Sequence, residues 1–127
     1  MRGFPERVTE TEHKELTIIL VDRVRKNTNN LLWCNCTPIP ENMPQGQTNS
    51  VKGPNSKQQQ LTNISVINRN KSIAEEMTIM KVELLDLYNK MKPIQHLVQR
   101  PKDIHFFPKG GIIMSNHICK QLKELFF

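Results

Sequence analysis

Two short groups of cysteine and histidine residues carry the side chains best suited to chemistry. Cys34 and Cys36 are separated by one residue, and His117 and Cys119 are spaced in the same way much further along the chain. Thiolate and imidazole groups are zinc ligands, but the paired cysteines of zinc sites are usually separated by about two to four residues. We therefore expect no metal site and no cofactor, and we interpret these thiols as ordinary, partly buried side chains.

Local motifs do not reveal a catalytic centre. The histidines are scattered, and none lies in an HExxH motif or in a short-range arrangement with serine, aspartate or cysteine. A triad can also be dispersed along a chain, where no local motif would reveal it. A short, polar chain nevertheless offers little scaffold for a preorganised pocket. We expect a protein without enzymatic activity.

Length and charge limit the classes of function. The chain has 127 residues, of which 37% are hydrophobic and 6% aromatic. A chain of this size with a long polar stretch can bury only a modest core by itself, which draws attention to partners. The net charge of +6 suits nucleic acid or another anionic surface. The positive residues are nevertheless spread along the chain rather than gathered in a run.

The N-terminal residues and the apolar runs predict an intracellular protein. No apolar core of a signal peptide is recognisable, and the longest apolar run, residues 18–21, is too short to span a membrane. We expect a nuclear or cytoplasmic protein, neither secreted nor bound to a membrane, with reduced cysteines. Glycosylation sequons begin at Asn35, Asn63 and Asn70, and we interpret them as coincidental in an asparagine-rich chain.

The strongest pattern lies between residues 72 and 98, where apolar residues recur at alternating spacings of four and three. This heptad seam consists of Ile73, Met77, Met80, Leu84, Leu87, Met91, Ile94 and Val98. Ser72 and Glu75 can form a capping box at its start, and Pro93 stops or kinks a helix at its end. The pattern predicts a helix over 72–92, with a kinked extension as far as residue 100.

The seam has two interpretations. The helix either packs as an amphipathic helix against the rest of its own chain, or forms a coiled coil or bundle with another helical chain or a second copy. On the second interpretation, the eight seam residues bind the partner. Further possible anchors are Trp33, Phe126 and Phe127. Trp33 could equally cover the end of the first helix, and Phe126 could pack on the central helix.

A first helix is predicted over about 10–29. Thr9 and Glu12 can form its capping box. Its apolar side consists of Leu16, Leu20, Val24 and Leu31, with Ile19 beside them. Several β-branched residues leave a strand over 16–22 as the alternative.

The remaining chain contains a linker and a last helix. Residues 38–71 are rich in proline, glutamine and asparagine, which predicts a disordered linker. A helix is predicted over 115–126, with Ser115 as its cap. The chain then divides into an N-terminal helix with a Trp/Cys segment (1–37), the linker, and a helical region (72–127).

These patterns predict a mainly α fold of about three helices. The function that suits it best is a small interaction subunit of an intracellular complex, working through the heptad-patterned helix. The first alternative is a basic protein whose residues 42–71 contact nucleic-acid phosphates. The second is an autonomous helical domain without an identifiable activity.

Overall fold

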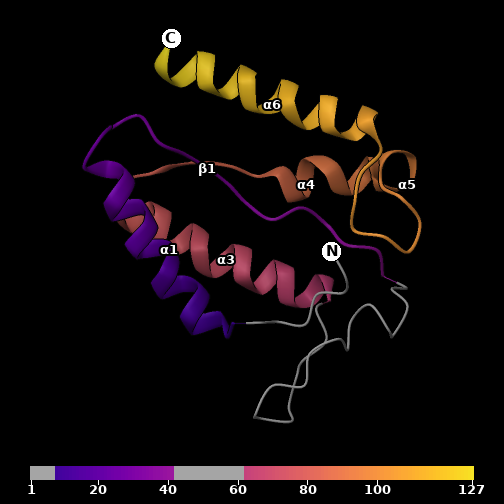
Figure 1. Cartoon of the computed structure of the whole chain (residues 1–127), viewed down its shortest axis with the longest axis horizontal. Coiled ribbons are helices and arrows are strands. Elements are labelled where there is room, and N and C mark those ends of the chain that lie inside the picture. The colour runs from indigo at the N-terminus through magenta and orange to yellow at the C-terminus, as the bar shows by residue number, and fades with distance from the viewer. Residues whose placement is uncertain (1–7, 42–61) are drawn as a thin grey trace.

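The computed structural model of the protein describes residues 8–41 and 62–127, and over these residues the chain is mainly helical (Figure 1). In chain order the elements are α1 (Glu10–Arg25), β1 (Leu32–Cys34), α3 (Asn63–Ile79), β2 (Glu83–Leu85), α4 (Leu87–Met91), the short 3₁₀ helix η1 (Lys92–Ile94), α5 (Gln95–Val98) and α6 (Pro108–Phe126). The predicted mainly α class is confirmed. Most of the predicted linker, residues 42–61, lies outside the described residues.

The core lies between the α1–α3 pair and a small parallel sheet. β1 pairs with β2 in parallel, with Trp33 opposite Leu84. One buried cluster consists of Val21, Ile73, Met77 and Val82, with Leu31, Trp33, Met80 and Leu84 packed against it. A second consists of Ile39, Val66 and Tyr88. In Figure 1, α6 lies on the opposite side of the strands from α1 and α3.

The predicted continuous helix over 72–92 is wrong, because α3 ends at Ile79 and the chain turns into β2. Lys81 adopts a left-handed conformation with a φ of 56°. Its N–H donates to the Thr78 carbonyl (3.2 Å), and the Val82 N–H donates to the Met77 carbonyl (2.8 Å). This pair of bonds is the Schellman termination, in which one left-handed residue reverses the chain after the last turn.

A side chain from α1 also holds the end of α3. The guanidinium of Arg25 donates to the Met80 carbonyl and, at 3.2 Å, to the Lys81 carbonyl. The last carbonyls of a helix lack partners within the helix, so an arginine that binds them stabilises the break. The turn thus depends on a residue far away in the sequence.

The start of α3 also differs from the prediction. Residues 63–71, expected to be part of the linker, form its first half. Thr62 and Ser65 form the N-terminal capping box, whereas Ser72, the predicted cap, lies inside the helix. The predicted capping box at Ser72 is wrong, because Thr62 and Ser65 already begin the helix ten residues earlier and leave the Ser72 region as one of its inner turns.

The two outer helices were predicted with different accuracy. The helix α1 and its capping box are confirmed: the Glu12 N–H donates to Thr9 Oγ1 (3.1 Å) and the Thr9 N–H to Glu12 Oε2 (2.9 Å). It ends before residue 29, and the alternative strand over 16–22 is wrong. The helix α6 begins with Pro108 in its first turn, well before the predicted cap Ser115, because proline suits the first helical position.

Candidate functional site

Two asparagines of α3 hold an extended segment of the N-terminal half. Asn63 Nδ2 donates to the Ile39 carbonyl (2.7 Å), and the Ile39 N–H donates back to Asn63 Oδ1 (3.0 Å). Asn70 binds both backbone groups of Cys36 in the same way, at 2.9 and 3.0 Å. An amide side chain that satisfies both groups of one residue replaces a missing β-strand partner.

Asp86 joins β1 to the start of α4. Its carboxylate accepts bonds from Asn35 Nδ2 (2.9 Å), from the Asn89 N–H (3.1 Å) and from the Asn89 side chain. Asn35 Oδ1 in turn accepts the Tyr88 N–H (3.0 Å). Burial alone would raise the pKa of the Asp86 carboxyl, but these hydrogen bonds outweigh it and lower the pKa.

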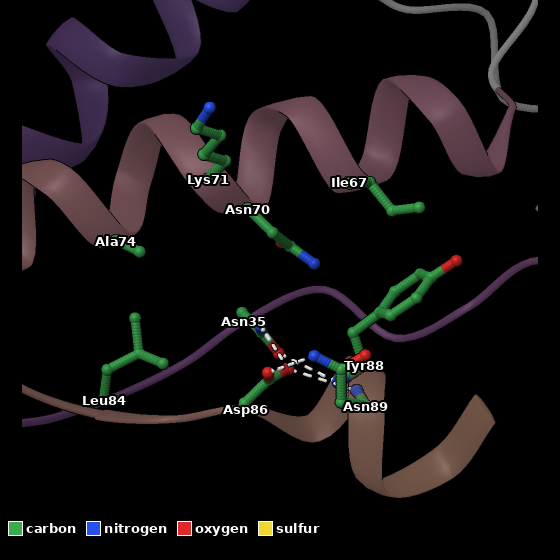
Figure 2. A pocket seen from close by; sticks show the side chains of 9 residues that line it. All are labelled: Asn35, Ile67, Asn70, Lys71, Ala74, Leu84, Asp86, Tyr88 and Asn89. Atoms are coloured by element: carbon green, nitrogen blue, oxygen red, sulfur yellow. Dashed lines mark hydrogen bonds between the residues drawn. The ribbon is translucent and has the colours of Figure 1, made fainter. Parts of the chain in front are cut away.

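A pocket of about 300 Å³ lies between this network and α3 (Figure 2). It is lined by Asn35, Ile67, Asn70, Lys71, Ala74, Leu84, Asp86, Tyr88 and Asn89. Most of its polar side chains are committed to the structural bonds given above. Its lining contains no histidine, cysteine or serine to act as a base or nucleophile. The polar lining of this pocket thus serves to join β1 and the segment after it to α3 and α4.

The three sequon asparagines are all structural. The Nδ2 atom to which a glycan would be attached donates to Asp86 from Asn35, to the Ile39 carbonyl from Asn63 and to the Cys36 carbonyl from Asn70. A glycan on any of them would replace one of the two hydrogens of the same Nδ2 atom that makes the structural bond. The sequons thus mark positions where the fold needs asparagine.

The cysteine thiols form no disulfide with one another, and burial affects the acidity of Cys34. Burial raises the pKa of the Cys34 thiol, which disfavours the reactive thiolate. Within residues 8–41 and 62–127, no three His, Cys, Asp or Glu side chains come together as metal ligands. Cys34, Cys36 and Cys119 are all free thiols.

The predicted seam residues do not form a single stripe. They are distributed over α3, β2, α4, η1 and α5 and the turn after α3. Five of them are buried in this chain: Ile73, Met77, Leu87, Met91 and Val98. Met80, Leu84 and Ile94 are half-buried, and Met80 and Leu84 pack against the core. These residues hold the chain together and present no continuous surface for a partner.

The predicted anchors have different environments. Trp33 packs against the core cluster around Val21 and Met77. Phe126 is half-buried, whereas Phe127 is 97% exposed. Of the three, only Phe127 is fully available to another molecule.

An apolar surface that the seam prediction missed lies on α1. Its side chains are Leu16, Ile19, Leu20 and Val24, with exposed fractions of 56%, 48%, 52% and 39%. We call these four residues the α1 face. Their spacing of three or four places them on one side of the helix. The sequence indicated this apolar side but not that it would point away from the core.

The inward side of α1 makes both apolar and polar contacts with the rest of the chain. Its inward side buries Thr17 and Val21 against the core. Lys14 Nζ forms an ion pair with Glu76 Oε1 of α3 (3.0 Å), and Arg25 holds the end of α3 as described above. These contacts lie along one side of α1, so its most apolar side is turned outward.

Comparison with known proteins finds no family model that matches the chain and no significant similarity to a curated protein or a solved structure. No helix in the described part of the chain is both long enough and apolar enough to cross a membrane.

Proposed function

We propose that this protein is a helical interaction module that binds another protein chain through the α1 face. The observation that carries the proposal is the outward position of Leu16, Ile19, Leu20 and Val24. Isolated exposed apolar residues are common on protein surfaces, but a contiguous apolar patch marks a site of interaction.

The fold leaves a large part of the aliphatic surface of the α1 face exposed. Fully burying an aliphatic side chain contributes about 1.5–3 kcal/mol relative to leaving it exposed. Leu16 and Leu20 each remain more than half exposed, so much of this contribution is available to a partner. The heptad seam, in contrast, already contributes its apolar area to the core.

A photo-crosslinking experiment tests the proposal. A photoreactive amino acid would replace Ile19 in the full chain expressed in cells, with Ile112 as the matched control. Ile112 is also an exposed isoleucine of a helix, 62% exposed, but lies on α6. We expect a discrete crosslinked protein adduct from position 19 and none from position 112.

A variant adds specificity to this test. Leu20→Lys should abolish the adduct at position 19 while changing thermal stability little, because Leu20 is half exposed and not part of the core. Equal labelling from both positions, or an adduct that persists in the Leu20→Lys variant, would show that the α1 face does not select a partner.

The nucleic-acid alternative rests on the net charge of +6. Of the basic residues in the segment expected to contact phosphates, Lys52 and Lys57 lie outside the described residues. Arg69 is buried and donates to the Val8 carbonyl (2.6 Å), while Lys71 is exposed. Binding to phosphates would weaken steeply with added salt, whereas contacts between the apolar side chains of the α1 face are not weakened by salt screening.

A further inference from the structure

Two residues of the α1 face, Leu16 and Ile19, belong to a heptad-spaced row with one charged residue at each end. Glu12, Leu16, Ile19 and Arg23 follow one another at spacings of four, three and four. Glu12 and Arg23 are both exposed, as are the two aliphatic residues between them. The resulting row has an acid at one end, a base at the other and two aliphatic residues in the middle.

Such a row is complementary to itself in the antiparallel direction. When a second copy of α1 is placed antiparallel across a two-fold axis, Leu16 meets Ile19 of the second copy. Glu12 then meets Arg23 of the second copy, and the symmetry repeats both pairs. In a parallel arrangement Glu12 would face Glu12 and Arg23 would face Arg23, so charge selects the antiparallel direction.

The carboxylate of Glu12 can serve the helix and the partner together. Its Oε2 accepts the Thr9 N–H in the capping box, and a carboxylate has further acceptor sites on its second oxygen. Pairing with an arginine would therefore leave the start of α1 intact.

The two edges of the row differ. On one edge Leu20 extends the apolar area. On the other edge Glu15 and Asp22 are exposed, and the antiparallel arrangement brings Glu15 toward Asp22 of the second copy. This repulsion weakens the pairing, and an interface one helix wide is already small, so the association belongs to the weak, reversible class.

We infer that the partner of the α1 face is a second copy of this chain, bound antiparallel through α1 with Leu16 against Ile19 and Glu12 against Arg23. The inference rests on the proposed interaction function and identifies the partner for it.

Charge reversal tests the direction of the pairing. Glu12→Lys alone and Arg23→Glu alone each place like charges opposite one another, twice per dimer. Since each variant replaces two attractive contacts by two repulsive ones, we expect it to associate at least about tenfold more weakly than the natural chain. Sedimentation equilibrium of the full chain over a wide concentration range measures this. Lys120→Glu, an exposed position on α6, is the control and should associate like the natural chain.

Mixing the two variants separates loss of pairing from loss of folding. In the mixed dimer, the lysine at position 12 faces the glutamate at position 23, and the remaining pair is the natural Arg23 with Glu12. An equimolar mixture should therefore recover the association of the natural chain, although each variant alone associates more weakly. A variant that failed to fold could not be rescued in this way.

A strengthening variant provides an independent check. Asp22→Lys converts the repulsion with Glu15 of the second copy into attraction, so we expect association to become about tenfold tighter. Either of two results would overturn the inference: a chain that remains monomeric at millimolar concentration, or charge variants that associate like the natural chain. If such a monomeric chain still gave the adduct at position 19, the proposed function would stand with a different partner.

Discussion

Lys81 occupies a backbone conformation that side chains with a Cβ rarely adopt. Among the residues that the structure describes, only Lys81 and Lys102 combine a positive φ with a residue other than glycine. The left-handed conformation costs roughly 1–2 kcal/mol for most residues, yet it is needed here because the chain must leave α3 and enter β2. The lysine at this turn therefore lowers the free energy of unfolding relative to a residue that adopts the left-handed conformation without cost.

Replacing this lysine by glycine should stabilise the protein. Glycine adopts a φ of 56° without steric cost, so Lys81→Gly should raise the free energy of unfolding by about 1 kcal/mol. Thermal or urea unfolding measures the change. The control Lys71→Gly, at an exposed position inside α3, should lower it by about 1 kcal/mol. Equal losses in both variants would contradict the role assigned to Lys81.

Individual residues differ in how well their structural role can be predicted from the sequence. The Thr9–Glu12 capping box was predictable because both partners lie within one turn of the helix. The end of α3 was not, because a Schellman turn is usually recognised by its glycine and here the position holds a lysine. The paired hydrogen bonds of Asn63 with Ile39 and of Asn70 with Cys36 could not be predicted either, since the partners are far apart in the sequence.

At the scale of elements, α6 joins the fold through a close backbone contact. The Phe107 N–H donates to the Val98 carbonyl (2.8 Å), and Gln99 pairs with Phe106 as an antiparallel bridge. A Cβ added to Gly110 would lie 3.0 Å from the Val98 carbonyl oxygen and 3.0 Å from Phe106 Cδ1. Glycine at this position allows the first turn of α6 to approach α5.

Two neighbouring glycines of α6 should therefore respond in opposite ways to alanine. Gly110→Ala should destabilise the protein by about 1–3 kcal/mol, because the added methyl group overpacks against a backbone carbonyl. Gly111→Ala meets nothing within 4 Å and should stabilise it by about 0.5–1 kcal/mol through helix propensity. Unfolding curves of the two variants decide the matter, and a gain in both would mean that the α5–α6 approach is looser than described.

The helix α1 illustrates how an element can be predicted while its orientation is not. Its start and its cap agree with the prediction, although it ends at Arg25 rather than near residue 29, and its apolar side was identified. The side that packs inward is nevertheless the one that carries Lys14, Thr17 and Arg25. The inward side also buries Val21 in the core cluster, and it adds an ion pair and the binding of two carbonyls by Arg25. None of these contacts with α3 is visible from helical periodicity.

For the whole molecule, His13 makes stability depend on pH. Burial, together with the positive charge of Arg69, lowers the pKa of His13 below its usual 6.5. Its Nδ1 is buried and has no hydrogen-bond partner among the described residues. The unfolded chain therefore binds a proton more readily than the folded one. The stabilisation is complete above the unfolded pKa of about 6.5 and is lost progressively as the pH falls from there through the lower pKa of the folded chain.

Thermal unfolding followed over a series of pH values measures this effect. We expect the melting temperature of the natural chain to fall as the pH is lowered below about 6.5. His13→Gln should reduce this dependence, because glutamine does not titrate. The lowered pKa of the Asp86 carboxyl acts only in more acidic solution, outside the range in which His13 titrates. If the melting temperatures of the two proteins fell equally with pH, the loss of stability would come from a group other than His13.

The sequence by itself determined the helical class, the start of α1 and the apolar side of that helix, because capping and periodicity act over a few residues. Only the tertiary structure decided where α3 ends, which side of α1 faces outward, and that the seam belongs to the core. These outcomes depend on Arg25 reaching Met80 across 55 positions and on the pairing of β1 with β2. Contacts between distant residues can override a heptad pattern, because several short elements can remove the same apolar side chains from water as one continuous helix would.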